Sequence, residues 1–173
     1  MTTLLNTAIL LLSLSATWLL LWSASHLSLG YALLAAWLFS LVNNTPFALM
    51  HEAVHGVASR SPRLNRLLGV VAGWAFPTSF LMQRTAHIGH HQRNRTDEEL
   101  YDYYLPHQSR RVRNLWLYAG NLFGLYWVSV VAGNLVYLVA PWAYRSRFFA
   151  QRLAPALGFG PYVADLVKLP AAT

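Results

Sequence analysis

Residues 29–55 read LGYALLAAWLFSLVNNTPFALMHEAVH, and this stretch decides the fold. Its first part, Leu29–Met50, carries no charged residue and is long enough to cross a bilayer, whose hydrocarbon core needs about 20 helical residues. The run ends directly at His51-Glu52-Ala53-Val54-His55. On a helix, residues i and i+4 project from the same face, about one turn apart. The stretch therefore predicts an apolar helix that carries two converging imidazoles at its end.

A second group of histidines follows at His87-Ile88-Gly89-His90-His91. Imidazole is a common nitrogen ligand for iron, zinc and copper, and the chain has no cysteine to compete. The alternative, that the histidines are unrelated surface or core residues, explains the clustering poorly. We therefore expect a metal site formed by five of the seven histidines: His51, His55, His87, His90 and His91.

The composition indicates a membrane protein. The chain is 55% hydrophobic and only 11% charged, whereas about a quarter of the residues in a soluble domain are charged. The absence of cysteine excludes a disulfide framework and a thiolate metal site. The net charge of +7 is compatible with nucleic-acid binding. The basic residues flank the apolar runs, however, so membrane topology explains them better and we expect no nucleic-acid partner.

The apolar run at the start of the chain, Leu4–Trp22, is also uncharged. Ser23–Ser28 is expected to form a short turn, so this run and Leu29–Met50 predict a transmembrane hairpin. The first run has no basic residue before it and is longer than the apolar region of a signal peptide. We therefore expect a retained helix.

Two further apolar stretches follow. Leu67–Met82 is short and contains two glycines and a proline, which favours a re-entrant or interfacial segment. Leu115–Tyr144 is long enough for one tilted span or two half-spans. The predicted fold is all-α: an integral membrane protein with a transmembrane hairpin, re-entrant or interfacial helices, and a further long apolar helix or helical hairpin. We expect residues 1–173 to form one membrane-embedded domain.

The arginines predict the orientation. By the positive-inside rule, the region between the second and fourth stretches, with both histidine groups, is cytoplasmic. Basic residues also follow Leu115–Tyr144, so this stretch either bends back near Gly133-Asn134 or is followed by a translocated tail. The arginines before the fourth stretch are Arg60, Arg63, Arg66, Arg84, Arg93, Arg95, Arg110, Arg111 and Arg113, and those after it are Arg145, Arg147 and Arg152.

Two boxes of the form H-x-x-x-H and H-x-x-H-H, about thirty residues apart beside a helical hairpin, resemble the membrane fatty acid desaturase superfamily. The resemblance covers roughly Leu29–Tyr144. It implies a non-haem di-iron centre that uses dioxygen to oxidise an acyl chain or another long apolar lipid. The outcome would be desaturation, hydroxylation or ketonisation. It also implies an electron donor such as ferredoxin, rubredoxin or a cytochrome.

The chain departs from this pattern because the family's third box, H-x-x-H-H, is missing. His26 is expected on the opposite side of the membrane, and His107 lies alone in a polar loop. We therefore expect residues 1–173 to be an interrupted domain that holds a partial metal site and has no turnover. Two alternatives to the desaturase-type oxidoreductase are an inactive truncated membrane protein with a partial metal site and a membrane zinc metalloprotease, because His51-Glu52-x-x-His55 is also the HExxH signature. A zinc site would leave most of the second box unexplained.

Three residues are candidates to hydrogen-bond the metal-ligating histidines without binding the metal themselves. Glu52, Asn94 and Asp97 lie close to the boxes in sequence and could fix the orientation of the imidazoles. For Asp97 the alternative is a solvated acidic loop, and for Asn94 an ordinary asparagine at a helix end. Asn43-Asn44 before Pro46 predicts either polar groups facing a pathway or a proline kink.

Overall fold

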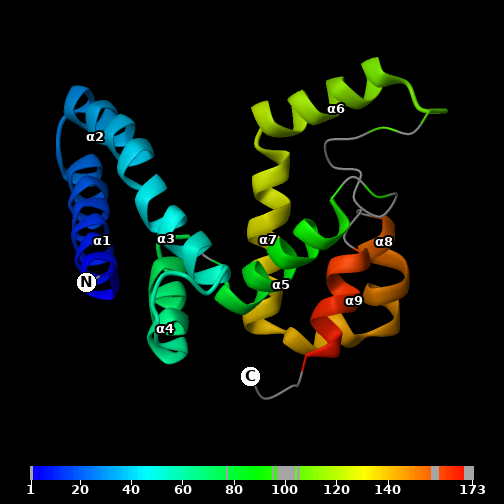
Figure 1. Ribbon diagram of the computed structural model, residues 1–173. Coiled ribbons are helices and arrows are strands. Elements are labelled where there is room, and N and C mark those ends of the chain that lie inside the picture. Colours follow the sequence, from blue (N-terminus) through cyan, green and yellow to red (C-terminus); the bar gives the residue numbers. More distant parts are fainter. Residues whose placement is uncertain are drawn as a thin grey trace. The chain divides into compact units, whose positions relative to one another are not determined.

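The computed structural model describes residues 2–76, 78–94, 96, 104, 106–156 and 160–169, and every regular element in these ranges is helical. This confirms the all-α prediction (Figure 1). The chain divides into two compact units, Met1–Phe80 and Leu81–Thr173. Each unit contributes one of the two histidine groups.

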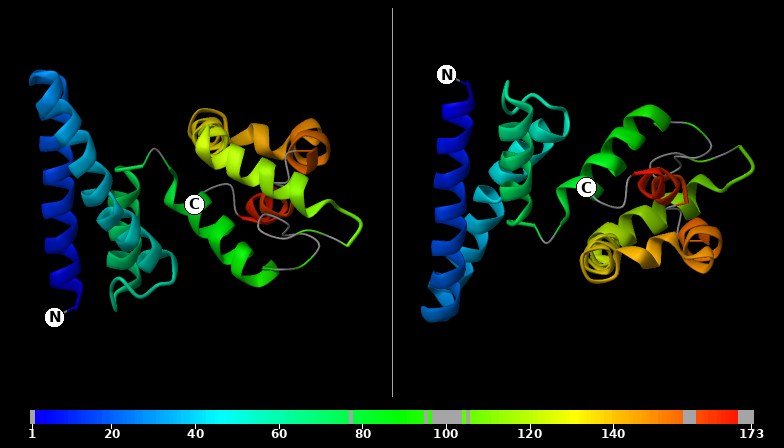
Figure 2. Two further views of the ribbon diagram at one scale, coloured as in Figure 1. Left: turned by 90° about the horizontal axis from the view of Figure 1, so that it is seen from above. Right: turned by 90° about the horizontal axis from the view of Figure 1, so that it is seen from below.

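The first unit starts with a helical hairpin of α1 (Thr2–His26) and α2 (Leu29–Val42), which lie side by side in Figures 1 and 2. The expected turn at Ser23–Ser28 is wrong, because α1 continues to His26. In this last turn the Ser25 hydroxyl donates to the Leu21 carbonyl, and His26 Nδ1 lies 2.9 Å from the Trp22 carbonyl oxygen. Thr2–His26 and Leu29–Val54 are each long and apolar enough to cross a membrane by length and composition.

The second apolar run is broken near Asn43. α2 ends there and α3 (Asn44–Val54) begins, with Pro46 in its first turn. Pro46 has no N–H for the Val42 carbonyl of the preceding turn, and the Asn44 side chain donates to another carbonyl, that of Ser40, at 3.2 Å. The backbone of Asn43 stays in the helical region, with φ −67° and ψ −17°. The histidine pair therefore sits on its own short helix.

α4 (Pro62–Gly73) packs against α3 and closes the core of the first unit. Ser61 caps α4 by accepting from the Leu64 N–H. Within Leu67–Met82, α4 ends at Gly73 and α5 starts at Phe80, so the stretch contains a break between two helices, and the re-entrant or interfacial placement stays a prediction. Three successive backbone bonds from 74–76 to 71–73 tighten the end of α4. The buried core residues are Leu10, Leu49, Met50, Ala53, Ala58, Leu68 and Ala72.

The second unit is also helical. Around a small core, its last helices pack against one another through Tyr144, Ala154, Val163 and Leu166. α9 also meets α5 through an ion pair described below. The elements are α5 (Phe80–Arg93), α6 (Arg110–Leu122), α7 (Leu125–Val139), η1 (Pro141–Arg145), η2 (Phe149–Leu153), α8 (Ala154–Ala156) and α9 (Gly160–Lys168).

The fourth apolar stretch breaks at Gly124, where α6 ends and α7 turns sharply away from it (Figure 1). Gly124 has φ +70°, a left-handed conformation that costs a residue with a Cβ about 1–2 kcal/mol. Of the two alternatives for this stretch, the bend near Gly133-Asn134 is wrong, because α7 runs through both residues. The Gly133 carbonyl there accepts a 2.7 Å hydrogen bond from the buried Tyr144 hydroxyl.

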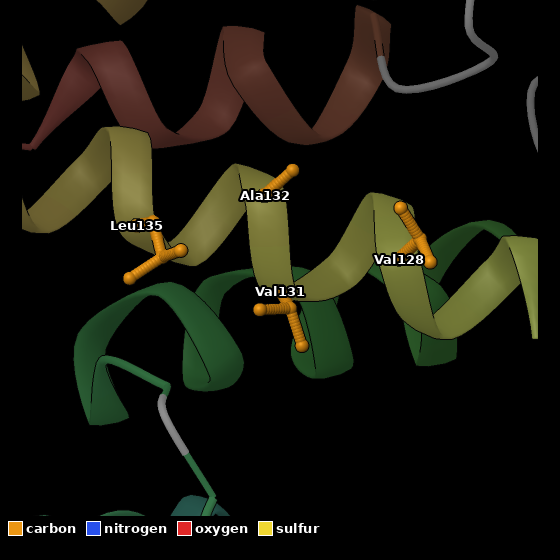
Figure 3. Close-up of a pocket in the computed structure, with 4 residues that line it drawn as sticks. All are labelled: Val128, Val131, Ala132 and Leu135. Carbon is orange, nitrogen blue, oxygen red and sulfur yellow. The ribbon is translucent and has the colours of Figure 1, made fainter.

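One side of α7 forms a shallow apolar groove of about 380 Å³. Its four lining residues project from successive turns of the helix, as Figure 3 shows. Those residues are Val128, Val131, Ala132 and Leu135.

Candidate metal centre

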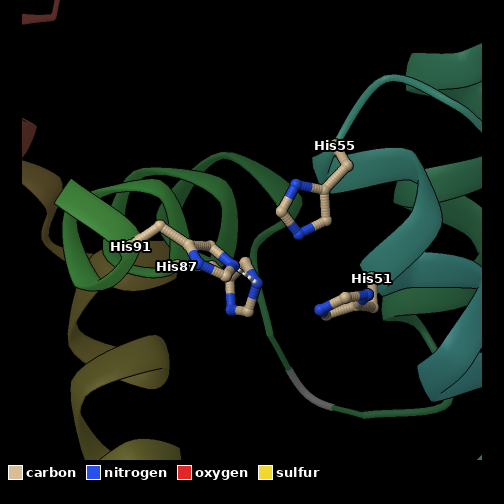
Figure 4. A group of neighbouring side chains, drawn as sticks. All are labelled: His51, His55, His87 and His91. Carbon is tan, nitrogen blue, oxygen red and sulfur yellow. Dashed lines mark hydrogen bonds between the residues drawn. The ribbon is translucent and has the colours of Figure 1, made fainter. Parts of the chain in front are cut away.

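The first histidine pair lies at the end of α3 (Figure 4). His51 is in the last turn and His55 is the residue that follows the helix, so the two rings project from the same face. Their centroids are 4.7 Å apart with an interplanar angle of 61°. His51 is half-buried and His55 is exposed. The predicted i, i+4 pair is therefore formed within the first unit.

The chain leaves α3 through a glycine. Gly56 has φ +80°, its N–H donates to the Ala53 carbonyl at 3.1 Å, and the Val57 N–H donates to the Glu52 carbonyl at 3.0 Å. These two bonds form the Schellman motif, which ends a helix with a left-handed residue, usually glycine. The sequence analysis missed this motif, although a glycine directly after the last helical residue is its ordinary signal. The motif fixes the backbone that follows His55.

The second pair lies on α5, where His87 and His91 are one turn apart (Figure 4). Their Nε2 atoms are 3.0 Å apart and their ring centroids 4.6 Å apart. Two nitrogen ligands at right angles, each about 2.1 Å from one metal, are themselves about 3.0 Å apart. The pair therefore fits two adjacent ligands of one metal ion. The His90 ring lies farther away, with its centroid 6.3 Å from that of His87 and 5.9 Å from that of His91.

α9 holds α5 in place through a charged contact. The Arg93 guanidinium donates to the Asp165 carboxylate at 2.6 Å and lies 5.1 Å from the ring centroid of Tyr162. A Cβ at Gly89 would come too close to the Arg93 guanidinium, so a larger residue there would require the end of that side chain to shift. Burial raises the pKa of Asp165, but the hydrogen bonds and charges of Arg93 and Lys168 outweigh it and leave the pKa below its ordinary value. Asp165 is therefore ionised and anchors the histidine helix.

The residues predicted to support the ligands fall in different places. The Glu52 side chain is exposed, and the backbone carbonyl of this residue belongs to the Schellman motif. Asn94 is exposed in the turn directly after α5, as expected of an asparagine at a helix end. Asp97 lies outside the described residues. His26 stacks on Trp22 at the end of α1, with centroids 4.8 Å apart.

Fold and residues together define a helical protein with candidate membrane spans and paired imidazoles, each of which can offer one nitrogen to a metal. The family model for fatty acid desaturases matches residues 16–171, so the chain belongs to the fatty acid desaturase family. The comparisons with curated proteins and with solved structures found no match. The match confirms the resemblance and extends it beyond both boxes to α9. Membership points to oxidoreductase chemistry on fatty acyl chains and to membrane association.

Proposed function

We propose that this protein is an integral membrane oxidoreductase that introduces a double bond into a fatty acyl chain at an iron centre held by histidines. One observation carries the proposal: a chain of the fatty acid desaturase family presents two imidazole pairs at helical spacing, His51 with His55 and His87 with His91. We further propose that both pairs serve one centre and that His90 is a fifth ligand. Hydroxylation is the related outcome that the same centre would allow.

The reaction balances with an external electron donor. The acyl chain loses two hydrogens from adjacent carbons, and dioxygen takes up these two hydrogens, two electrons and two protons to give two molecules of water. Iron, when bound, would supply the activation of dioxygen, which no side-chain acid or base can do. The chain itself would hold the imidazoles in position, exclude water and orient the acyl chain. The two electrons would come from a ferredoxin, rubredoxin or cytochrome partner.

The ligand set limits what residues 1–173 can bind. Two irons with about four to six ligands each, some of them open to dioxygen, need more than five imidazoles. His26 ends α1, where its ring stacks on Trp22, and His107 lies in a turn before α6. We therefore propose that the five imidazoles by themselves hold fewer than two irons per chain.

The membrane arrangement is part of the proposal. Thr2–His26 and Leu29–Val54 would form a transmembrane hairpin, with both histidine boxes on the cytoplasmic side and the two units working as one domain. Cysteines introduced at Ser61 and Arg84 would then be labelled from the same compartment, and the chain has no native cysteine to interfere. Labelling from opposite compartments would separate the boxes and defeat the proposal.

α6 would lie in the membrane–water interface. Val112, Leu115, Trp116 and Leu122 recur at helical spacing on one face and are 54%, 68%, 65% and 80% exposed. An amphipathic helix with an exposed apolar face and arginines beside it lies in the plane of an interface, where the arginines meet anionic headgroups. The arginines of its first turn are Arg110, Arg111 and Arg113.

The apolar groove on α7 is the surface that we propose for part of the acyl chain. The exposed fraction is 65% for Val128 and 50% for Leu135, and the lining residues that the structure describes are all aliphatic. Aliphatic side chains of this kind suit the methylene portion of a lipid.

The test of the proposed centre measures metal retention, with peptide cleavage as the readout for the zinc alternative. The 173-residue protein is purified in detergent, supplied with ferrous or zinc ions and dialysed, and its bound metal is measured. We expect iron to be retained and His87→Ala with His91→Ala together to abolish the retention. A chain that retains one zinc, keeps it after the double substitution and cleaves peptide bonds would instead be a metalloprotease. In that case Glu52→Gln would abolish the cleavage, because that glutamate would be the general base.

A further inference from the structure

A buried asparagine on α4 connects the two ends of the loop that follows His55. The Asn65 side chain is 8% exposed, and both ends of its amide are used. Its nitrogen donates to the Ala53 carbonyl at 2.7 Å, and its oxygen accepts from the Ser59 N–H at 3.3 Å. Ala53 lies between His51 and His55 in the last turn of α3. The amide therefore joins α4 directly to the turn that carries the first imidazole pair.

The bond to Ala53 reinforces the Schellman motif. The Ala53 carbonyl accepts from both the Gly56 N–H and the Asn65 side chain, so the end of α3 is tied to its own loop and to a neighbouring helix. A carbonyl has two lone pairs and can take both bonds. The last turn of a helix otherwise has carbonyls without partners and frays easily. Here the second bond comes from a rigid, buried donor.

α1 holds the same loop from another direction. The Asn6 side chain donates to the Ala58 carbonyl at 2.8 Å, and the Thr3 and Ser59 hydroxyls are 3.0 Å apart. Ala58 is 0% exposed and Ser59 5%. Two residues of the loop, Ala58 and Ser59, are therefore buried and bonded to α1 and α4, while Gly56, Val57 and Arg60 are exposed. Asn65 is the one side chain among these partners that also reaches α3.

We infer that Asn65 is a positioning residue of the proposed metal centre, fixing the direction in which His51 and His55 project. The inference rests on the proposed function. Partners that orient metal-ligating histidines by direct contact are typically worth about 10–100-fold in metal affinity. Asn65 acts through the backbone of the helix turn and not through the rings, so we expect the lower end, about tenfold.

The test uses cobalt(II), because its visible absorption reports the ligand geometry independently of turnover. The full 173-residue chain is titrated with cobalt in detergent as wild type, Asn65→Leu and Asn65→Asp. The aspartate can still accept from the Ser59 N–H but cannot donate to the Ala53 carbonyl, so it isolates that bond. Asn114→Leu, at an exposed position on α6, is the matched control. Far-UV circular dichroism confirms the helical content of each variant.

We expect both Asn65 variants to bind cobalt about tenfold more weakly with a shifted visible band, while Asn114→Leu matches the wild type. If Asn65→Leu folds and binds cobalt with the affinity and spectrum of the wild type, the inference about Asn65 is wrong while the proposed centre stands. A purely structural role of Asn65 would lower stability without moving the visible band. If Asn65→Leu does not fold, Asn65→Asp decides in the same way. A wild-type chain that binds no cobalt would overturn the proposed centre and this inference with it.

Discussion

Replacing Gly56 with alanine isolates the contribution of one backbone conformation to the first histidine pair. A Cβ at this position would meet no atom within 4 Å, so the substitution introduces no collision. Gly56 has φ +80°, however, and the left-handed region costs a residue with a Cβ about 1–2 kcal/mol. The stiffer unfolded chain returns roughly 0.4–1 kcal/mol. The net expectation is a loss of about 1 kcal/mol in the free energy of unfolding.

Gly30→Ala is the matched control. Gly30 also has open space around an added Cβ, but it lies in ordinary helical backbone in α2 of the same unit. Alanine is favoured over glycine in a helix by up to about 1 kcal/mol, so this variant should be slightly more stable than the wild type. Both variants are unfolded by denaturant in detergent and followed by far-UV circular dichroism.

The two alanines should therefore change stability in opposite directions, and Gly56→Ala should also weaken cobalt binding, because the strain falls on the residue after His55. If Gly56→Ala is as stable as Gly30→Ala, the left-handed turn does not constrain the end of α3. The Schellman motif would then have no part in holding the pair.

Three further outcomes are expected. Gly69→Ala should cost about 1–3 kcal/mol, measured by denaturant unfolding, because its Cβ would collide with the Phe80 ring in a packed core. Asp165→Asn should flatten the acid limb of the plot of unfolding free energy against pH. Arg93 lowers the folded-state pKa of the Asp165 carboxyl, so the ionised carboxylate stabilises the fold above the unfolded pKa of about 3.9. This stabilisation is lost as the pH falls through the folded-state pKa. Nitroxide-labelled cysteines placed one at a time along α6 in lipid nanodiscs should show oxygen accessibility that rises and falls with the helical period.

Each of these expectations has a clear contrary result. A Gly69→Ala protein as stable as the wild type would mean that the Phe80 ring has room to move. An unchanged acid limb in Asp165→Asn would mean that the ion pair adds nothing to stability. For α6, equal oxygen accessibility at Leu115 and Asn114 would place the helix wholly inside the bilayer or wholly in water.

The helical pairs were predictable because they depend only on local periodicity. Once residues 51–55 are helical, His51 and His55 share a face whatever the rest of the chain does. The same holds for His87 and His91, whereas the choice between His90 and His91 depends on ring orientation, which spacing does not determine. The apolar runs likewise predicted α1 and α2 from length and hydrophobicity alone.

The ends of the helices and the contacts that support the histidine helices were harder to predict, because they depend on contacts between distant residues. A glycine at either position 124 or position 133 would allow the chain to bend. The helix continues through Gly133, whose carbonyl accepts a hydrogen bond from the Tyr144 hydroxyl. The Arg93–Asp165 pair joins residues 72 apart, and no local pattern marks its partners. Asn65 looked like one more polar residue in an arginine-rich segment until its two bonds were seen.

The loop after His55 also implies an order of assembly during synthesis. Its bonds from Thr3 and Asn6 span 56 and 52 residues, and Asn65 closes it from the other side. All of these partners lie in the first 65 residues, well before His87 is made. A ribosome-bound chain can thus complete the first half of the ligand set while the second half is still inside the ribosome. The first unit would then fold before the second, and slow translation after residue 65 should help the protein to fold.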